Sequence, residues 1–308
     1  MPIAGGTGPL SLDYIGQDPG HVWIPFVAAS SGAVAVFDTT KGTFAIVPGF
    51  KTVEREGHGQ KRAMGPSSVS AGDGVVYVGN RGTAEICVID ATKLSVGKCL
   101  KLSSSPDGVA YVAAAHEVWV TTPADHSLTV LDASKKDTLK VKTTIKVDGD
   151  PEGYAVDAEN GLFFTNLEDK NRTLEIDVKT HRIVATWSPS CGADGPRGIA
   201  VDGHRKLVIV ACTDHLQVLD AGHDGAPLGQ LDTGAGVDNI DLVGSLVYAA
   251  AGKSARMTIA RVDDHGALSV VASGTTSDGA RNAVADKDGK AYVVDGKNAL
   301  LLVVQPSH

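Results

Sequence analysis

The apolar residues of this chain recur in short alternating segments, and almost no stretch shows the 3.6-residue spacing of an amphipathic helix. A phrase of the form "VxVxD", or a close relative, recurs along most of the chain. Its copies end at Asp38, Asp90, Asp132, Asp177, Asp220 and Asp263. Most copies follow one another after about 40 to 45 residues, a period typical of propeller blades built from four short strands. The pattern therefore predicts a repeated β-structure.

One repeat shows the order of strands within the unit. Residues 149–187 contain the segments "GYAVD", "GLFFTN", "TLEID" and "RIVATW", separated by turn-forming residues such as Glu-Asn-Gly. A single four-stranded sheet of this kind cannot cover both of its own faces. Several sheets packed around an axis bury those faces, so the repeats are expected to form a ring.

The phrase that opens each repeat gives the number of blades. Seven copies are found: residues 8–15 "GPLSLDYI", 65–70 "GPSSVS", 105–112 "SPDGVAYV", 150–157 "DPEGYAVD", 195–202 "GPRGIAVD", 236–243 "GVDNIDLV" and 279–286 "GARNAVAD". We therefore predict an all-β, seven-bladed propeller with four-stranded blades around a central channel, forming a single domain over residues 1–308. The outer strand of the seventh blade is unassigned, and an N-terminal segment is a candidate to complete it.

The phrases "YVGN" at residues 77–80, "ICVID" at 86–90 and "PEGYAVD" at 151–157 resemble those of the YVTN-repeat family of seven-bladed propellers. That family is found largely in bacteria, and the resemblance covers essentially the whole chain. It implies the fold. It implies little about function, because propellers include enzymes, ligand binders and scaffolds.

Composition and charge exclude two classes of partner. With 43% hydrophobic residues, the chain has no apolar run long enough to cross a bilayer, so we expect no membrane span. The net charge of -8 opposes binding to a phosphate backbone, so no nucleic-acid partner is expected. The first ten residues lack the features of a signal peptide. We expect a monomer that is cytoplasmic as written, or periplasmic or secreted if a leader was removed.

The residue after the proline-like position of each opening phrase is expected to face the channel. This ring is Leu10, Ser67, Asp107, Glu152, Arg197, Asp238 and Arg281. The ends of the second strands should face the same rim: Phe26, Asn80, Thr122, Asn166, Cys212, Ala251 and Asp295. Together they would bring four carboxylates and two guanidinium groups into one poorly solvated space.

Two explanations fit this cluster of charges. In the first, the charges pair with one another and rigidify the channel entrance, with Arg197 between Glu152 and Asp238 and with Arg281 beside Asp238. In the second, oxygen ligands hold Ca²⁺, Mg²⁺ or Mn²⁺. The proposed ligands are Glu152, Asn166, Asp238 and Asn239. This set resembles the metal site of the gluconolactonase and senescence-marker propellers, although those have six blades and Arg197 would oppose a cation here.

The leading functional hypothesis is a metal-assisted, lactonase-like hydrolase acting on a small ester, lactone or phosphoester. Asp107 or Asp295 would act as general base, and Arg197 and Arg281 would hold an oxyanion or an anionic substrate group. His58 lies in the long insertion between the first two blades, a candidate flap over the mouth. The alternative is a non-catalytic propeller that binds a small anionic ligand or an acidic segment of a protein partner. No dinucleotide fingerprint or phosphate loop occurs, so no organic cofactor is expected.

The four cysteines form two candidate pairs. Cys87 and Cys99 lie on neighbouring strands of one hairpin, and Cys191 and Cys212 should both reach the channel rim. Either pair can form a disulfide, which would imply export, or remain as buried free thiols. Their spacings match no zinc-binding pattern.

Overall fold

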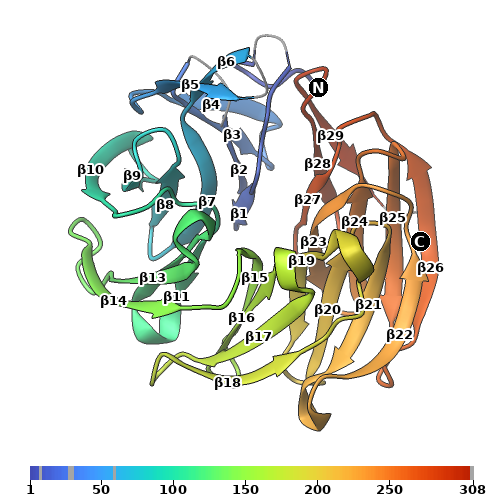
Figure 1. The fold of residues 1–308 in the computed structure, drawn as a ribbon. Coiled ribbons are helices and arrows are strands. Elements are labelled where there is room, and N and C mark those ends of the chain that lie inside the picture. The colour runs from blue at the N-terminus through green and yellow to red at the C-terminus, as the bar shows by residue number, and fades with distance from the viewer. Residues whose placement is uncertain (7–8, 27–30, 58–59, 306–308) are drawn as a thin grey trace. The chain divides into compact units, whose positions relative to one another are not determined.

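The computed structural model describes residues 1–6, 9–26, 31–57 and 60–305 (Figure 1). The chain divides into two compact units, Met1–Val147 with Asn298–Leu300, and Asp148–Lys297 with the residues from Leu301 onward. Both units consist of antiparallel sheets, each made of strands that are consecutive along the chain. The described helices are only three-residue 3-10 turns, and none is long enough to span a membrane. That the whole chain behaves as one domain stays a prediction.

The first unit contains three four-stranded sheets. Their strands are β1 (Gly16–Asp18), β2 (His21–Pro25), β3 (Val34–Asp38) and β4 (Thr43–Val47); β7 (Pro66–Gly72), β8 (Val75–Asn80), β9 (Glu85–Asp90) and β10 (Ser95–Lys101); and β11 (Val109–Val112), β12 (Glu117–Thr122), β13 (Ser127–Asp132) and β14 (Lys140–Lys146). The insertion after β4 forms a hairpin of β5 (Val53–Gly57) and β6 (Gln60–Met64). The turns η1 (Ala113–Ala115) and η2 (Pro123–Asp125) flank β12.

The first sheet differs from the prediction at its opening strand. The described part of residues 8–15 is not a strand, and β1 begins only at Gly16. The backbone N–H of Tyr14 donates to the carbonyl oxygen of Ser67 at 3.1 Å. A Cβ on Gly16 would lie 3.0 Å from the carbonyl oxygen of Val69, so the glycine permits β1 to approach β7 closely. Leu10 is therefore a buried core residue ahead of the sheet and does not open a strand.

The second unit holds three more four-stranded sheets and most of a three-stranded one. Their strands are β15 (Pro151–Asp157), β16 (Leu162–Leu167), β17 (Arg172–Asp177) and β18 (Arg182–Trp187); β19 (Pro196–Asp202), β20 (Leu207–Cys212), β21 (His215–Asp220) and β22 (Ala226–Asp232); β23 (Val237–Val243), β24 (Leu246–Ala251), β25 (Arg256–Val262) and β26 (Leu268–Thr275); and β27 (Asn282–Ala285), β28 (Ala291–Asp295) and β29 (Leu300–Val304). Its 3-10 turns are η3 (Glu168–Lys170), η4 (Gly192–Asp194) and η5 (Ala221–His223).

The N-terminal segment lies beside the last strand of the seventh sheet. Pro2 forms an isolated antiparallel bridge with Leu300, and the N–H of Ile3 donates to the carbonyl oxygen of Ala299 at 2.8 Å. The first residues of the chain thus supply the contact that the sequence left unassigned.

Each sheet buries its apolar faces against the next sheet in its unit. In the first unit, Trp23 of β2 and Val78 of β8 belong to one buried cluster. In the second, Ile209 of β20 and Val247 of β24 belong to another. Burial between neighbouring sheets explains why the alternating pattern recurs with every blade.

The recurring Asp of the "VxVxD" phrase binds backbone amides in the following turn, a usual role of Asp at this position. Asp38 Oδ1 accepts hydrogen bonds from the N–H groups of Thr40 at 3.0 Å and Lys41 at 2.8 Å. Equivalent bonds are made by Asp90, Asp132, Asp177, Asp220 and Asp263. These carboxylates are therefore structural.

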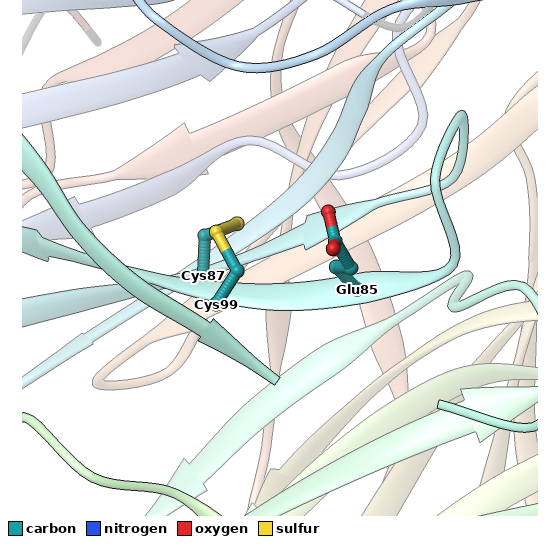
Figure 2. Close-up of side chains that lie close together, drawn as sticks. All are labelled: Glu85, Cys87 and Cys99. Carbon is teal, nitrogen blue, oxygen red and sulfur yellow. A yellow bond between two sulfur atoms is a disulfide. The ribbon is translucent and has the colours of Figure 1, made fainter. Parts of the chain in front are cut away.

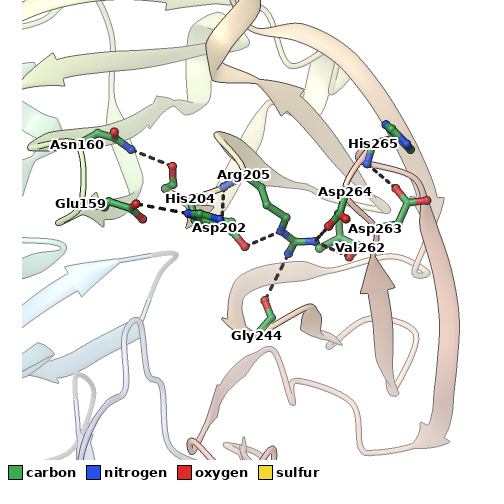
Figure 3. A network of polar contacts seen from close by, with 11 residues as sticks. Glu159, Asn160, Asp202, His204, Arg205, Gly244, Val262, Asp263, Asp264 and His265 are labelled. Carbon is green, nitrogen blue, oxygen red and sulfur yellow. Dashed lines mark hydrogen bonds and ion pairs between the residues drawn. The ribbon is translucent and has the colours of Figure 1, made fainter.

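Polar contacts join the turns of neighbouring sheets in the second unit (Figure 3). The Asn160 side-chain amide donates to the carbonyl oxygen of Gly203 at 2.9 Å. Arg205 pairs with Asp202 at 2.8 Å and donates through Nη1 to the carbonyl oxygen of Val262, also at 2.9 Å. These polar contacts connect three consecutive sheets, in addition to the packing of their apolar faces.

Candidate functional site

In the second unit, the innermost strands begin in close backbone contact. A Cβ built on Gly153 of β15 would lie 2.0 Å from the carbonyl oxygen of Arg197, and one on Gly198 of β19 would lie 2.6 Å from that of Asp238. The N–H of Asn239 donates to the carbonyl oxygen of Arg281 at 3.4 Å. A side chain at either glycine would push neighbouring strands apart, which explains why glycine follows Glu152 and Arg197.

A cavity of about 280 Å³ lies where these strands begin. Three predicted ring residues, Arg197, Asp238 and Arg281, line it together with Lys253 and Asp278. The prediction that Arg197, Asp238 and Arg281 lie close together is therefore confirmed. A volume just below the usual range for small-molecule pockets fits a small charged group or a single side chain.

The charges in this cavity are partly paired. Arg281 Nη1 lies 3.1 Å from Asp238 Oδ2, a pair expected from blade order. Arg197 instead pairs with Glu168, which lies in η3 just after β16. The prediction that the ring charges neutralise one another therefore holds for Arg281, and Arg197 has an acidic partner, Glu168, that the sequence did not indicate.

Within each unit, sequence reasoning missed charged residues that lie one or two positions beyond the second strands. Glu168 follows Asn166 by two positions, Lys253 follows Ala251 by two, and Arg81 directly follows Asn80. Counting past the last strand residue into the loop would have found them. Of the three, Lys253 lines the cavity, where it is exposed and adds a third cationic side chain.

Asn166, one of the proposed metal ligands, is fully buried and hydrogen-bonded. Its Nδ2 donates to the carbonyl oxygen of Arg197 at 2.6 Å, and its Oδ1 accepts from the Thr173 hydroxyl at 2.7 Å. The amide therefore fixes the start of β19. Asp238 faces a guanidinium, while Glu152 and Asn239 are half-buried at the starts of β15 and β23. These contacts compete with a bound cation.

Two other residues predicted to be catalytic, Asp107 and Asp295, are not among the residues that line this cavity. Asp107 belongs to the first unit, is buried, and pairs with Arg81, whose Nη1 also lies 2.8 Å from Asp13 Oδ2. Asp295 is buried at the end of β28. His58 lies outside the described residues. The described part of its hairpin contacts the loop after β8 through Arg55, whose Nη2 is 3.4 Å from the carbonyl oxygens of Arg81 and Gly82.

Both cysteine pairs form disulfides, Cys87–Cys99 and Cys191–Cys212. Of the two alternatives left by the sequence, the free thiols are excluded in this structure. Disulfides persist mainly in oxidising compartments, which agrees with the expectation of export. Export of the chain itself stays a prediction.

Among the described residues, one group of three His, Cys, Asp or Glu residues places its ligand atoms within 4.8 Å of one another: Glu85, Cys87 and Cys99 (Figure 2). Its sulfur atoms are joined in a disulfide and do not act as thiolate ligands in this state. A cation at Glu152, Asn166, Asp238 and Asn239 stays a prediction.

Several solved structures share the fold over nearly the whole chain. Kuenenia stuttgartiensis hydrazine synthase has a TM-score of 0.79 at 15% identity, covering 98% of this chain and 97% of that one. A chain of the mitotic checkpoint complex gives 0.72 at 11%, covering 96% and 87%. The WD40 propeller domain of Doa1 gives 0.73 at 14%, covering 99% and 96%.

These likenesses, together with the seven antiparallel sheets, define the chain as an all-β, seven-bladed β-propeller, as predicted. At such low identities they establish the fold alone. No family model matches the chain, and no curated protein matches it.

Proposed function

We propose that this protein is a non-catalytic binding propeller whose cavity at β19, β23 and β27 holds a carboxylate group from an acidic segment of a protein partner. The observation that carries this proposal is the convergence of Arg197, Lys253 and Arg281 on one small cavity. Guanidinium groups present a planar fork of donors that matches a carboxylate, and lysine adds a flexible positive charge at the rim.

The acids at this cavity, Asp238, Asp278 and Glu168, equal its three cations in number, so the proposal rests on how the cationic donors are placed and not on a net positive charge. Asp238 fixes the Arg281 guanidinium, and Glu168 fixes that of Arg197. Each guanidinium carries five N–H donors, so a single carboxylate partner does not use them all. Pre-positioned donors lower the entropy lost when a ligand binds.

The comparisons favour binding over catalysis only by analogy. One similar structure belongs to a protein assembly, the mitotic checkpoint complex, and another is a WD40 propeller. Membership of the YVTN-repeat family and the likeness to lactonase propellers remain predictions from the sequence. Hydrolysis of a small ester, lactone or phosphoester likewise stays a prediction, and the cavity residues support it less directly than they support anion binding.

The proposal is tested with a fluorescent glutamate-rich peptide and a glutamine-rich peptide of equal length. Fluorescence anisotropy should show binding of the first that weakens at high salt, because partly exposed charges are screened. Arg197→Ala and Lys253→Ala should each weaken binding about tenfold, as expected for loss of a charged hydrogen bond of about 1.4 kcal/mol. Arg182→Ala, on the exposed outer strand β18, is the matched control and should bind normally.

Three outcomes would count against this function. Equal affinity for the glutamine peptide would show that charge is not recognised. Full competition by millimolar acetate or phosphate would point to a small anion as the natural ligand. Turnover of an ester, lactone or phosphotriester that disappears in Glu152→Ala and on chelation would restore the metal-assisted hydrolase.

A further inference from the structure

A second cluster of chemically active side chains lies in the first unit, on one face of the β7–β10 sheet. Glu85 and Cys87 are two residues apart on β9 and so share a face, and Cys99 is the direct partner of Cys87 on β10. One oxygen of Glu85 and the two sulfur atoms lie within 4.8 Å of one another (Figure 2). Pairing of the two strands, independent of the disulfide, holds these positions together.

These side chains line a cavity of about 480 Å³, larger than the carboxylate-binding cavity proposed in the second unit. Lys51 and Phe50, from the loop after β4, form another part of its wall. Cys99 is exposed, whereas Cys87 is buried, so an attacking thiol can reach one sulfur atom of the disulfide. The cavity also has room for water or another small ligand beside the cluster.

We propose that reduction of the Cys87–Cys99 disulfide turns Glu85, Cys87 and Cys99 into a Zn²⁺ site with three protein ligands and a fourth position open to the cavity. Two thiolates and a carboxylate are a ligand set that zinc accepts, whereas Ca²⁺ and Mg²⁺ avoid sulfur. Tetrahedral zinc with Zn–S bonds of about 2.3 Å separates two sulfurs by about 3.8 Å, so the two sulfurs must move apart by side-chain rotation once the disulfide is broken.

The redox step balances with a dithiol as the reductant. Its thiolate attacks Sγ of Cys99, the S–S bond breaks, and Cys87 leaves as a thiolate. The second thiol of the reductant then attacks the reductant sulfur that is bonded to Cys99 in the mixed disulfide, and Cys99 leaves as a thiolate. Two electrons pass to the protein, the reductant leaves as a disulfide, and its two protons end on the cysteines or in solvent. Zinc binding displaces the protons that remain on sulfur.

Glu85 is oriented for this role by a neighbouring hydroxyl. The Thr83 hydroxyl donates to Glu85 Oε2 at 2.5 Å, which fixes the carboxylate. Contacts of this kind, one step removed from the metal, hold ligands in place and tune their affinity.

The test uses the full chain, reduced with a phosphine, desalted without oxygen and titrated with Zn²⁺ against a chromophoric chelator. Reduced protein should bind one zinc that oxidised protein does not. Co²⁺ in its place should show a thiolate charge-transfer band and tetrahedral d–d bands. Glu85→Gln should weaken zinc binding about tenfold or more while both thiols remain.

Two double variants separate this site from stray binding. Cys87→Ser with Cys99→Ser should lose the reduction-dependent zinc, and Cys191→Ser with Cys212→Ser should keep it. Circular dichroism of the reduced wild type reports whether the sheet persists. Equal zinc binding before and after reduction, retention by the Cys87/Cys99 double variant, or loss of the fold on reduction would each overturn the proposal.

Discussion

The side chain of Asp241 accepts a hydrogen bond from the backbone N–H of Ala285, with 2.7 Å between Oδ2 and the nitrogen. Asp241 lies on β23 and Ala285 on β27, so a carboxylate links the innermost strands of two consecutive sheets. Its Oδ1 also accepts from the N–H of Leu242 at 2.8 Å. Despite these bonds, burial raises the pKa of Asp241 from the ordinary value of an aspartate to about 6.

This raised pKa predicts a pH-dependent stability. Because the folded state holds the proton more tightly than the unfolded state, the contribution of Asp241 is full below about pH 4 and is lost as pH rises through about 6. The loss is at most about 3 kcal/mol, since the residue keeps some solvent contact. Urea unfolding of wild type and Asp241→Asn should be measured at pH 4.5 and 7. The unfolding free energy of wild type, relative to that of Asp241→Asn, should fall on going to pH 7. The exposed Asp137→Asn is the control, and parallel curves for all three proteins would refute the linkage.

The close start of β15 and β19 predicts that Gly153→Ala strongly destabilises the protein. Its new Cβ would lie 2.0 Å from the Arg197 carbonyl oxygen, so the two strands must separate, at a loss of about 2 to 3 kcal/mol in unfolding free energy. Gly274→Ala is the matched control, because a Cβ there meets nothing within 4 Å. Thermal unfolding followed by circular dichroism measures both. Equal melting temperatures for the two variants would contradict this packing.

The Asp238–Arg281 pair predicts opposite results for the two functions considered. If the cavity binds a carboxylate, Asp238→Asn keeps an oxygen that accepts from Arg281 but removes a repelling charge, and should strengthen binding of the glutamate peptide about fivefold, equivalent to about 1 kcal/mol. If Asp238 were a metal ligand, the same change would weaken metal binding and abolish turnover. Anisotropy and metal analysis of one protein preparation distinguish these results.

Arg81 is predicted to be essential for stability because it faces the buried carboxylate of Asp107. Arg81→Met should lower the unfolding free energy by about 2 to 3 kcal/mol, the lower end for breaking a buried ion pair, since Arg81 is partly exposed. Adding Asp107→Asn should recover part of that loss. Strictly additive losses in a double-mutant cycle measured by urea unfolding would mean that the pair is not coupled.

The sequence was sufficient for the blades and for part of the site. Strand alternation and the repeated turn carboxylates are local signals, so they are visible in each repeat. The position of Arg197, Asp238 and Arg281 on one cavity followed from the repeat because equivalent residues take equivalent places.

The missed residues depend on loops, which do not repeat. Glu168, Lys253 and Arg81 lie in segments whose conformation differs from blade to blade, so the period says nothing about where their side chains point. The predicted start of the first sheet was wrong for a similar reason, since the contact of Gly16 with β7 sets where β1 begins.

The pairing of Pro2 and Ile3 with Ala299 and Leu300 has a consequence for the order of folding. These partners are separated by nearly all of the described strands, so bringing them together closes a very long loop. A contact of such long sequence separation forms late and slowly, so residues 2 and 3 remain unpaired until the strands between the two segments have folded.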